Sequence, residues 1–240
     1  MSEIVDRAAK SNAAGVKTQT LADDVFSQMR DAIVRGDFEP GSKINEPQLA
    51  AQYGISRGPL REAIRRLEGA KLVEIKPNAG AKVISLKKSQ ALEIYEIRES
   101  LEGLACRLAA RKASSEDCLK LRDLLATHEA QIQSEDGRLY YQKAGDLDFH
   151  YQIVSLSRNQ RLFDLLCGEL YHLLRLCRVK TSSQPSRPEQ AFKEHHHIVD
   201  AIEHGDAELA DILMRRHIAS AKNTFINALN QIDEELSSGD

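Results

Sequence analysis

Three consecutive histidines, His195, His196 and His197, lie in a stretch whose apolar residues recur with a helical period. Successive residues on an α-helix are turned by about 100° from one another, so three neighbours cannot all face one point. His195 falls near the middle of the apolar arc of this helix, whereas His197 falls on the opposite side. The pattern therefore predicts that His195 faces the protein interior and that His197 faces solvent.

Two other predicted helices carry inward-facing histidines. His150 follows Asp146 by four residues and shares a helical face with it, and His217 shares a face with apolar neighbours. Imidazole and carboxylate are ordinary ligands of zinc, nickel, iron and manganese, and a metal would stabilise a carboxylate that is costly to bury alone. These side chains could hold a divalent metal. A buried histidine with an ordinary hydrogen bond, or an Asp–His hydrogen bond, remains the alternative.

Arginines begin another predicted helix, at Arg57 and Arg61, directly after the candidate N-cap Ser56. An arginine at a helix N-terminus can bind a guanine edge in the major groove or hold a phosphate. Arg65, one turn further along, is a candidate for phosphate contact. The alternative for these arginines is a solvated helix face.

A predicted hairpin that carries Gly80 and Lys82 follows this helix. Glycine would allow a close approach of the backbone to DNA there. The first helix begins at Leu21 and ends at Gly36, and a short helix runs from its cap Asn45 to about Gly54. A short helix, a tight turn, an arginine-bearing helix and a hairpin predict a winged helix-turn-helix.

Beyond residue 88 the chain shows helical periodicity and no convincing strand. Six helical stretches are expected, at about 90–111, 115–134, 138–156, 159–180, 188–204 and 206–234, with Ser89, Ser115, Asn159 and Asp206 as candidate caps. The expected fold class is mainly α, a winged helix-turn-helix followed by an all-α six-helix bundle. The expected domains are a disordered tail at 1–18, the winged domain at 19–85 and the helical domain at 89–234.

Charge is distributed unevenly over the 240 residues, whose net charge is −3. Residues 57–82 hold seven basic and three acidic side chains, which is typical of a local DNA-binding surface on an acidic protein. The sequence has no 18-residue apolar run and no apolar segment at its start, and its four cysteines lack C-x-x-C spacing. We therefore expect no membrane association and a cytoplasmic protein with reduced thiols.

Residues 21–84 resemble the N-terminal domain of GntR-family transcription regulators. The matching stretches are IVRGDFEPGSKINEPQLA, GISRGPLREAIRRLEGAKLVEI and PNAGAKV. The resemblance implies that Arg57, Arg61 and Gly80 contact double-stranded operator DNA. Some members carry a DNA-contacting arginine where this chain has Pro47, so the helix before the turn is expected to make fewer contacts here.

Residues 89–232 resemble the FCD ligand-binding domain of the FadR branch of that family, and six helices suit its VanR-like subgroup. The matching stretches are YEIRESLEGLACRLAA, DLDFHYQIVSLSRNQRL, EHHHIVDAI and ADILMRRHI. The resemblance implies a divalent metal, with zinc expected first and nickel, manganese or iron as alternatives. By position, its ligands are Asp146, His150, His195 and His217.

The same resemblance implies a small organic acid effector whose carboxylate reaches the metal. Arg98 matches a family arginine that lines the effector pocket, and its alternative is a surface ion pair with Glu102. A homodimeric, ligand-responsive repressor is therefore expected, with each winged domain binding one half of an operator. A metal-dependent enzyme is the alternative from another class. It is disfavoured because no inward glutamate or other general base is expected beside the ligands. A pure metal sensor is a third reading.

Overall fold

The computed structural model describes residues 20–134, 148–182 and 187–238. The predicted disordered tail at 1–18 and the candidate ligand Asp146 lie outside these ranges. The chain divides between Ile84 and Ser85 into two compact units, each of which is described by itself.

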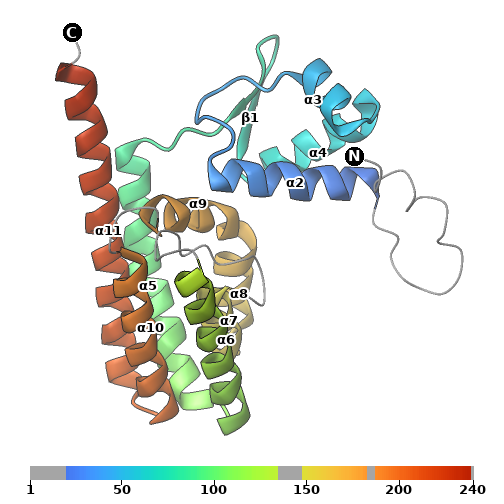
Figure 1. Cartoon of the computed structure of the whole chain (residues 1–240). Coiled ribbons are helices and arrows are strands. Elements are labelled where there is room, and N and C mark those ends of the chain that lie inside the picture. Colours follow the sequence, from blue (N-terminus) through green and yellow to red (C-terminus); the bar gives the residue numbers. More distant parts are fainter. Residues whose placement is uncertain (1–19, 135–147, 183–186, 239–240) are drawn as a thin grey trace, which may run out of the picture. The chain divides into compact units, whose positions relative to one another are not determined.

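From residue 20 onward, the first unit contains three helices followed by a two-stranded sheet: α2 (Leu21–Arg35), α3 (Glu46–Tyr53), α4 (Arg57–Gly69), β1 (Val73–Lys76) and β2 (Gly80–Val83) (Figure 1). A capping box between Thr20 and Asp23 begins α2, and Gly36 ends it with a left-handed φ of 90°. Asn45 caps α3 as predicted, by accepting a hydrogen bond from the backbone of Gln48.

The core of the first unit forms where α4 packs against α2 and α3. Its apolar residues recur every three or four positions, so each helix buries one face. Met29 and Ile33 of α2 meet Leu60 and Leu67 of α4 in this core, and all four are at most 2% exposed. Packing of this face turns the arginine-bearing side of α4 toward solvent.

The hairpin pairs β1 with β2 in antiparallel register, from Val73 opposite Val83 to Lys76 opposite Gly80. The turn uses left-handed backbone at Asn78 (φ 62°) and at Gly80 (φ 81°), a conformation that favours these residue types. These strands complete the predicted winged helix-turn-helix.

The second unit consists of helices throughout its described part: α5 (Lys88–Lys112), α6 (Ser115–Ser134), α7 (Phe149–Leu156), α8 (Gln160–Phe163), the π-helical segment η2 (Asp164–Glu169), α9 (Tyr171–Ser182), α10 (Arg187–Glu203) and α11 (Ala207–Ser238). The long helices α5 and α11 pack side by side, and α7 and α10 also contact α5 (Figure 1). A continuous apolar core that includes Tyr95, Phe149, Ile198 and Met214 joins these elements. The mainly α fold class is confirmed.

Two predicted helical stretches differ from the structure. The stretch at 159–180 is not one helix, because the π-helical segment η2 interrupts it between α8 and α9. Gly168, a poor helix former, lies in that interruption, and a π turn accommodates one extra residue. In the stretch at 138–156, residues 138–147 lie outside the described ranges, and the described helix α7 begins at Phe149 with Asp148 as its cap.

Of the four caps predicted for the second unit, Asn159 and Asp206 are confirmed by hydrogen bonds to backbone N–H groups of α8 and α11. Ser89 is wrong, because α5 already begins at Lys88. Ser115 is also wrong, because the preceding Ser114 exchanges the capping hydrogen bonds with Asp117. Among the described residues, no helix is long and apolar enough to cross a membrane.

Candidate functional site

The arginine face of α4 is exposed in the structure. Arg57, Arg61 and Arg65 all reach solvent, because Leu60 and Ile64 occupy the opposite, buried side of the helix. The N-terminal turn of α4 has no acidic residue, so its partial positive charge adds to that of the arginines. The face is therefore chemically suited to a polyanion.

A groove of about 500 Å³ brings α4 and the wing together. Its lining includes the predicted residues Arg57, Arg61 and Gly80, which are far apart in sequence. Arg65 and Lys82 are exposed as well but lie outside this lining. The structure thus gathers three of the five predicted DNA-contacting residues around one groove and leaves the other two accessible on α4 and β2.

Two residues of this groove were missed by the sequence analysis, Lys43 and Glu46. Lys43 forms an isolated β-bridge with Lys82, which places a further cation beside the wing. Glu46 accepts a hydrogen bond of 2.8 Å from Arg61 Nε. Lys43 could have been suspected from its charge in the turn before α3, but the pairing of Glu46 depends on the fold.

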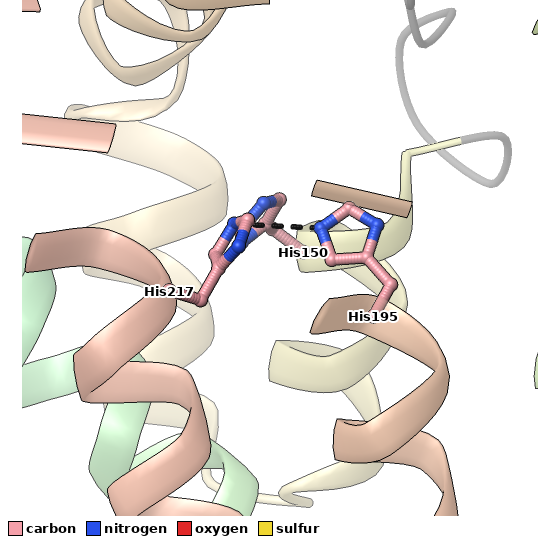
Figure 2. Close-up of side chains that lie close together, drawn as sticks. All are labelled: His150, His195 and His217. Atoms are coloured by element: carbon pink, nitrogen blue, oxygen red, sulfur yellow. Dashed lines mark hydrogen bonds between the residues drawn. The ribbon is translucent and has the colours of Figure 1, made fainter. Parts of the chain in front are cut away.

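The three predicted histidines come together from three helices, His150 from α7, His195 from α10 and His217 from α11 (Figure 2). All three are buried, with at most 4% of each residue exposed. Within the histidine run, His197 is exposed and His196 is half-buried, so the choice of His195 from helical periodicity is confirmed as a statement about burial.

The geometry of the cluster fits a metal. One ring nitrogen from each histidine lies within 4.8 Å of the others, and His195 Nε2 lies 3.4 Å from His217 Nε2. Two nitrogens bound tetrahedrally to zinc at about 2.1 Å would be about 3.4 Å apart. The same 3.4 Å distance allows a weak hydrogen bond between the two rings, so the spacing fits a metal without requiring one.

A buried glutamate lies beside the cluster, contrary to the prediction that no inward glutamate would be found there. Glu102 Oε2 lies 2.5 Å from His150 Nδ1, and Arg98 Nε donates to Glu102 Oε1 at 2.8 Å. Glu102 and Arg98 are each 1% exposed, so the alternative of a surface ion pair is also wrong. The cause is that α5 is covered by α11, α7 and α10, which buries more of its circumference than its apolar pattern suggests.

A second glutamate pairs with another histidine of the cluster. Glu194 Oε2 lies 2.6 Å from His217 Nδ1, and Arg187 Nη1 donates to the same oxygen at 2.8 Å. Arg187 is 3% exposed and also donates to the backbone carbonyl of His217 at 3.3 Å. The sequence analysis missed both residues, although Glu194 directly precedes His195.

Burial keeps the histidines neutral. It lowers the pKa of His150 to about 3, and the Arg178 guanidinium adds to this effect. Burial also lowers the pKa of His195 well below its ordinary value and lowers that of His217. Neutral imidazole has the free lone pair that a metal requires, so the cluster is competent for coordination near neutral pH.

The carboxylate partner of His150 stays ionised. Burial alone would raise the pKa of Glu102, but Arg98, then His150 and Arg178, hold it well below its ordinary value. Asp148 is also buried and ionically paired, with Arg178 Nη1 at 2.8 Å, and it caps α7 through the N–H of His150. Asp148 therefore fixes the start of the helix that carries His150.

Arg98 has one guanidinium nitrogen without a role in this network. Its Nη1 is buried and makes no hydrogen bond within the described part of the chain. An unsatisfied buried donor is costly, so an acceptor that reached this atom would be bound favourably. Arg98, which the family resemblance placed in an effector pocket, thus retains a donor for a ligand.

Comparison with known proteins assigns a family domain to each unit. Residues 21–83 match the family described as bacterial regulatory proteins of the gntR family, and residues 93–220 match the FCD domain. The chain is 32% identical over 212 residues to an uncharacterized HTH-type transcriptional regulator, YdhC, of Bacillus subtilis, covering 88% of this chain and 91% of the relative. It is 29% identical over 209 residues to the HTH-type transcriptional repressor GlaR of Escherichia coli K12, covering 81% and 91%.

A solved structure agrees with these matches. A GntR transcriptional regulator from Rhodococcus sp. RHA1 superposes with a TM-score of 0.69 at 25% identity, covering 86% of this chain and 98% of that one. These relatives are transcription regulators and not enzymes. The chain belongs to the GntR family of bacterial transcription regulators, with an N-terminal gntR DNA-binding domain and a C-terminal FCD domain.

Proposed function

We propose that this regulator is a homodimeric, cytoplasmic repressor whose FCD domain binds a divalent metal, zinc first, and a small organic acid. Each winged domain binds one half of an operator through Arg57, Arg61 and Gly80, with Arg65 and Lys82 on the phosphate backbone. Effector binding changes the affinity for the operator, and by linkage the operator changes the affinity for the effector by the same factor.

One observation supports the metal site above all: three buried histidines on three separate helices present ring nitrogens within 4.8 Å of one another. Such convergence leaves a coordination position for a carboxylate, which Asp146 would supply from outside the described residues. Three histidines and one carboxylate are hard-to-borderline nitrogen and oxygen ligands, which suit zinc, nickel, manganese or iron.

The effector is proposed to be a carboxylate for two reasons. A bound metal can expand its coordination to accept one carboxylate oxygen. The buried Nη1 of Arg98 offers a donor, and a guanidinium pairs well with a planar carboxylate. The proposal that the protein represses transcription is supported by its similarity to a relative named as a repressor.

The experiment compares the wild type with His195→Ala/His217→Ala. Metal per protomer is measured by mass spectrometry, and both proteins are titrated with operator DNA, with and without a panel of small carboxylic acids. We expect about one metal in the wild type, none in the folded double variant, and an acid-dependent operator affinity in the wild type alone.

Each contrary result has a separate meaning. The metal site is refuted if the folded wild type holds no metal after supply of zinc, nickel, manganese and iron in turn. Operator affinity that follows free metal but ignores every acid would indicate a pure metal sensor. Operator affinity that responds to neither would contradict the proposed switch while leaving the DNA-binding family assignment intact.

A further inference from the structure

Two of the three clustered histidines share one arrangement at Nδ1: a glutamate contacts this nitrogen, and an arginine donates to the glutamate. His150 Nδ1 lies 2.5 Å from Glu102, and Arg98 donates to that glutamate. His217 Nδ1 lies 2.6 Å from Glu194, to which Arg187 donates. We call each Arg–Glu–His chain a relay. The two relays come from different helices, so their similarity does not result from local sequence.

The contact at Nδ1 decides which ring nitrogen can bind a metal. A neutral imidazole carries one proton, on either Nδ1 or Nε2, and only the other nitrogen has a free lone pair. An ionised carboxylate can only accept, so it selects the form with the proton on Nδ1. Nε2 then remains unprotonated and available as a ligand.

The arginines hold each carboxylate in place by donating hydrogen bonds to it. Arg98 is fully buried and gives its Nε to Glu102, while Arg178 Nη2 lies 3.6 Å from the same oxygen. Arg187 is buried and uses one guanidinium nitrogen for Glu194 and another for the backbone of His217. This second nitrogen also lies 3.4 Å from His217 Nδ1, a longer contact than the 2.6 Å from that atom to Glu194. Each glutamate is thereby fixed relative to the ring that it contacts.

The other side of the His217 ring faces the cluster. His217 Nε2 points toward His195 Nε2 at 3.4 Å, so the nitrogen opposite Glu194 is the one that faces the shared centre. The His195 ring stacks on Phe149, with ring centroids 4.0 Å apart and an interplanar angle of 21°. Both glutamates lie outside the group of side chains whose candidate ligand atoms converge in the described residues.

We propose that Glu102 and Glu194 are positioning residues of the metal centre, which hold His150 and His217 with Nε2 unprotonated and aimed at the metal. This inference rests on the proposed metal site. Arg98 then has two roles, since it anchors Glu102 through Nε and faces the effector through Nη1. A carboxylate effector would therefore contact the same residue that orients a metal ligand.

The test replaces each glutamate by its uncharged isostere, in Glu102→Gln and Glu194→Gln. A glutamine can turn its NH₂ group toward Nδ1, which favours the proton on Nε2 and blocks coordination. The matched controls are Glu99→Gln on α5, whose carboxylate pairs with Lys222, and Glu203→Gln on α10, whose carboxylate pairs with Arg122. Zinc affinity is measured by competition with a chelator, and ring protonation is read from ¹H–¹⁵N spectra of metal-free protein.

In the metal-free wild type, we expect the proton on Nδ1 of both His150 and His217. Each Gln variant should shift its own histidine toward the Nε2–H form and weaken zinc binding by about 10- to 100-fold. The controls should change neither quantity. The spectra also show whether each variant is folded.

The two readouts separate the possible failures. If both folded Gln variants bind zinc as tightly as the wild type does, the positioning role is wrong and the metal site remains. The wild type could instead bind no metal while each Gln variant still loses the proton on Nδ1 of its histidine. That result would overturn the metal site but keep the Glu–His contacts as structural pairs. Nε2 protonation in the metal-free wild type would contradict the relays directly.

Discussion

Arg61, which we propose contacts operator DNA, forms an ion pair in the absence of DNA. Its Nε donates to Glu46 at 2.8 Å, and the arginine side chain is 59% exposed. An ion pair this exposed contributes at most about 1 kcal/mol, so a guanine edge or a phosphate can compete with it. Glu46 therefore orders the guanidinium at the rim of the groove without blocking its use.

Replacing Arg61 by alanine should weaken binding to the cognate operator by about 1–3 kcal/mol, because a bidentate contact to a base is lost. The measurement is a fluorescence titration of operator and scrambled DNA at fixed salt. Arg111→Ala, which removes an exposed arginine from the second unit, is the charge-matched control. An unchanged operator curve for Arg61→Ala would remove this residue from the DNA-contacting set.

Helical periodicity identified His195 within its run of three because one residue step changes the direction of a side chain by about 100°. The same reasoning could not find Glu102. Periodicity reports which residues share a face, but not how many neighbouring helices cover a helix. Since three helices pack around α5, charged residues such as Arg98 and Glu102 lie inside and satisfy each other there.

At the scale of elements, the close approach of α5 and α11 depends on Gly103. A Cβ at this position would lie 2.5 Å from Asp211 Oδ1 and 3.0 Å from Arg215 Cγ. Asp211 cannot easily move away, because it is 4% exposed and accepts hydrogen bonds from Arg107 and Arg215. The glycine thus permits a packing that no larger residue would.

Gly103→Ala should lower the free energy of unfolding of the FCD domain by up to about 2 kcal/mol. Alanine gains about 1 kcal/mol in helix propensity, but overpacking costs about 1–3 kcal/mol. Chemical denaturation followed by circular dichroism measures the difference. Gly168→Ala, where a Cβ would meet nothing within 4 Å, should cause no such loss; equal effects of the two substitutions would show that the α5–α11 contact is not the cause.

The sequence predicted elements well where local chemistry determines them. Gly36 ends α2, Asn159 caps α8 and Gly80 adopts a left-handed φ at the hairpin turn, each through its own backbone or side chain. The π-helical interruption at Asp164–Glu169 was not predicted, because the helical period around it is nearly continuous. This segment also contacts α7, a contact that the local helical period does not reveal.

At the scale of the whole molecule, a dimer requires a surface that the FCD domain leaves uncovered. Large exposed apolar side chains in the described residues include Ile97 and Leu104 on α5 and Leu209 and Ile212 on α11, each at least 37% exposed. Ile97 and Leu104 are seven residues apart, so they share a face of α5. The two helices that carry these side chains pack against each other.

The direction of the two helices places these side chains together. Gly103 of α5 faces Asp211 of α11, while Glu99, nearer the start of α5, pairs with Lys222, further along α11. The helices are therefore antiparallel. When two antiparallel helices face each other at one residue each, the next residue of each helix points to the same side of the pair. Leu104 and Ile212 occupy these following positions, so one side of the α5–α11 pair presents an apolar surface suited to a second copy of the chain.

The double substitution Ile97→Glu/Leu104→Glu should dissociate the proposed dimer, because two carboxylates of each protomer would be desolvated at the contact. We expect the dimerisation constant to weaken by at least about 30-fold, which corresponds to about 2 kcal/mol. Sedimentation equilibrium measures this change, and operator affinity should fall with it because each protomer reaches one half-site. Leu119→Glu on α6, at a residue that is 62% exposed, is the control and should remain dimeric. If Leu119→Glu dissociates and the double variant does not, the contact lies on α6 and the α5–α11 surface has another purpose.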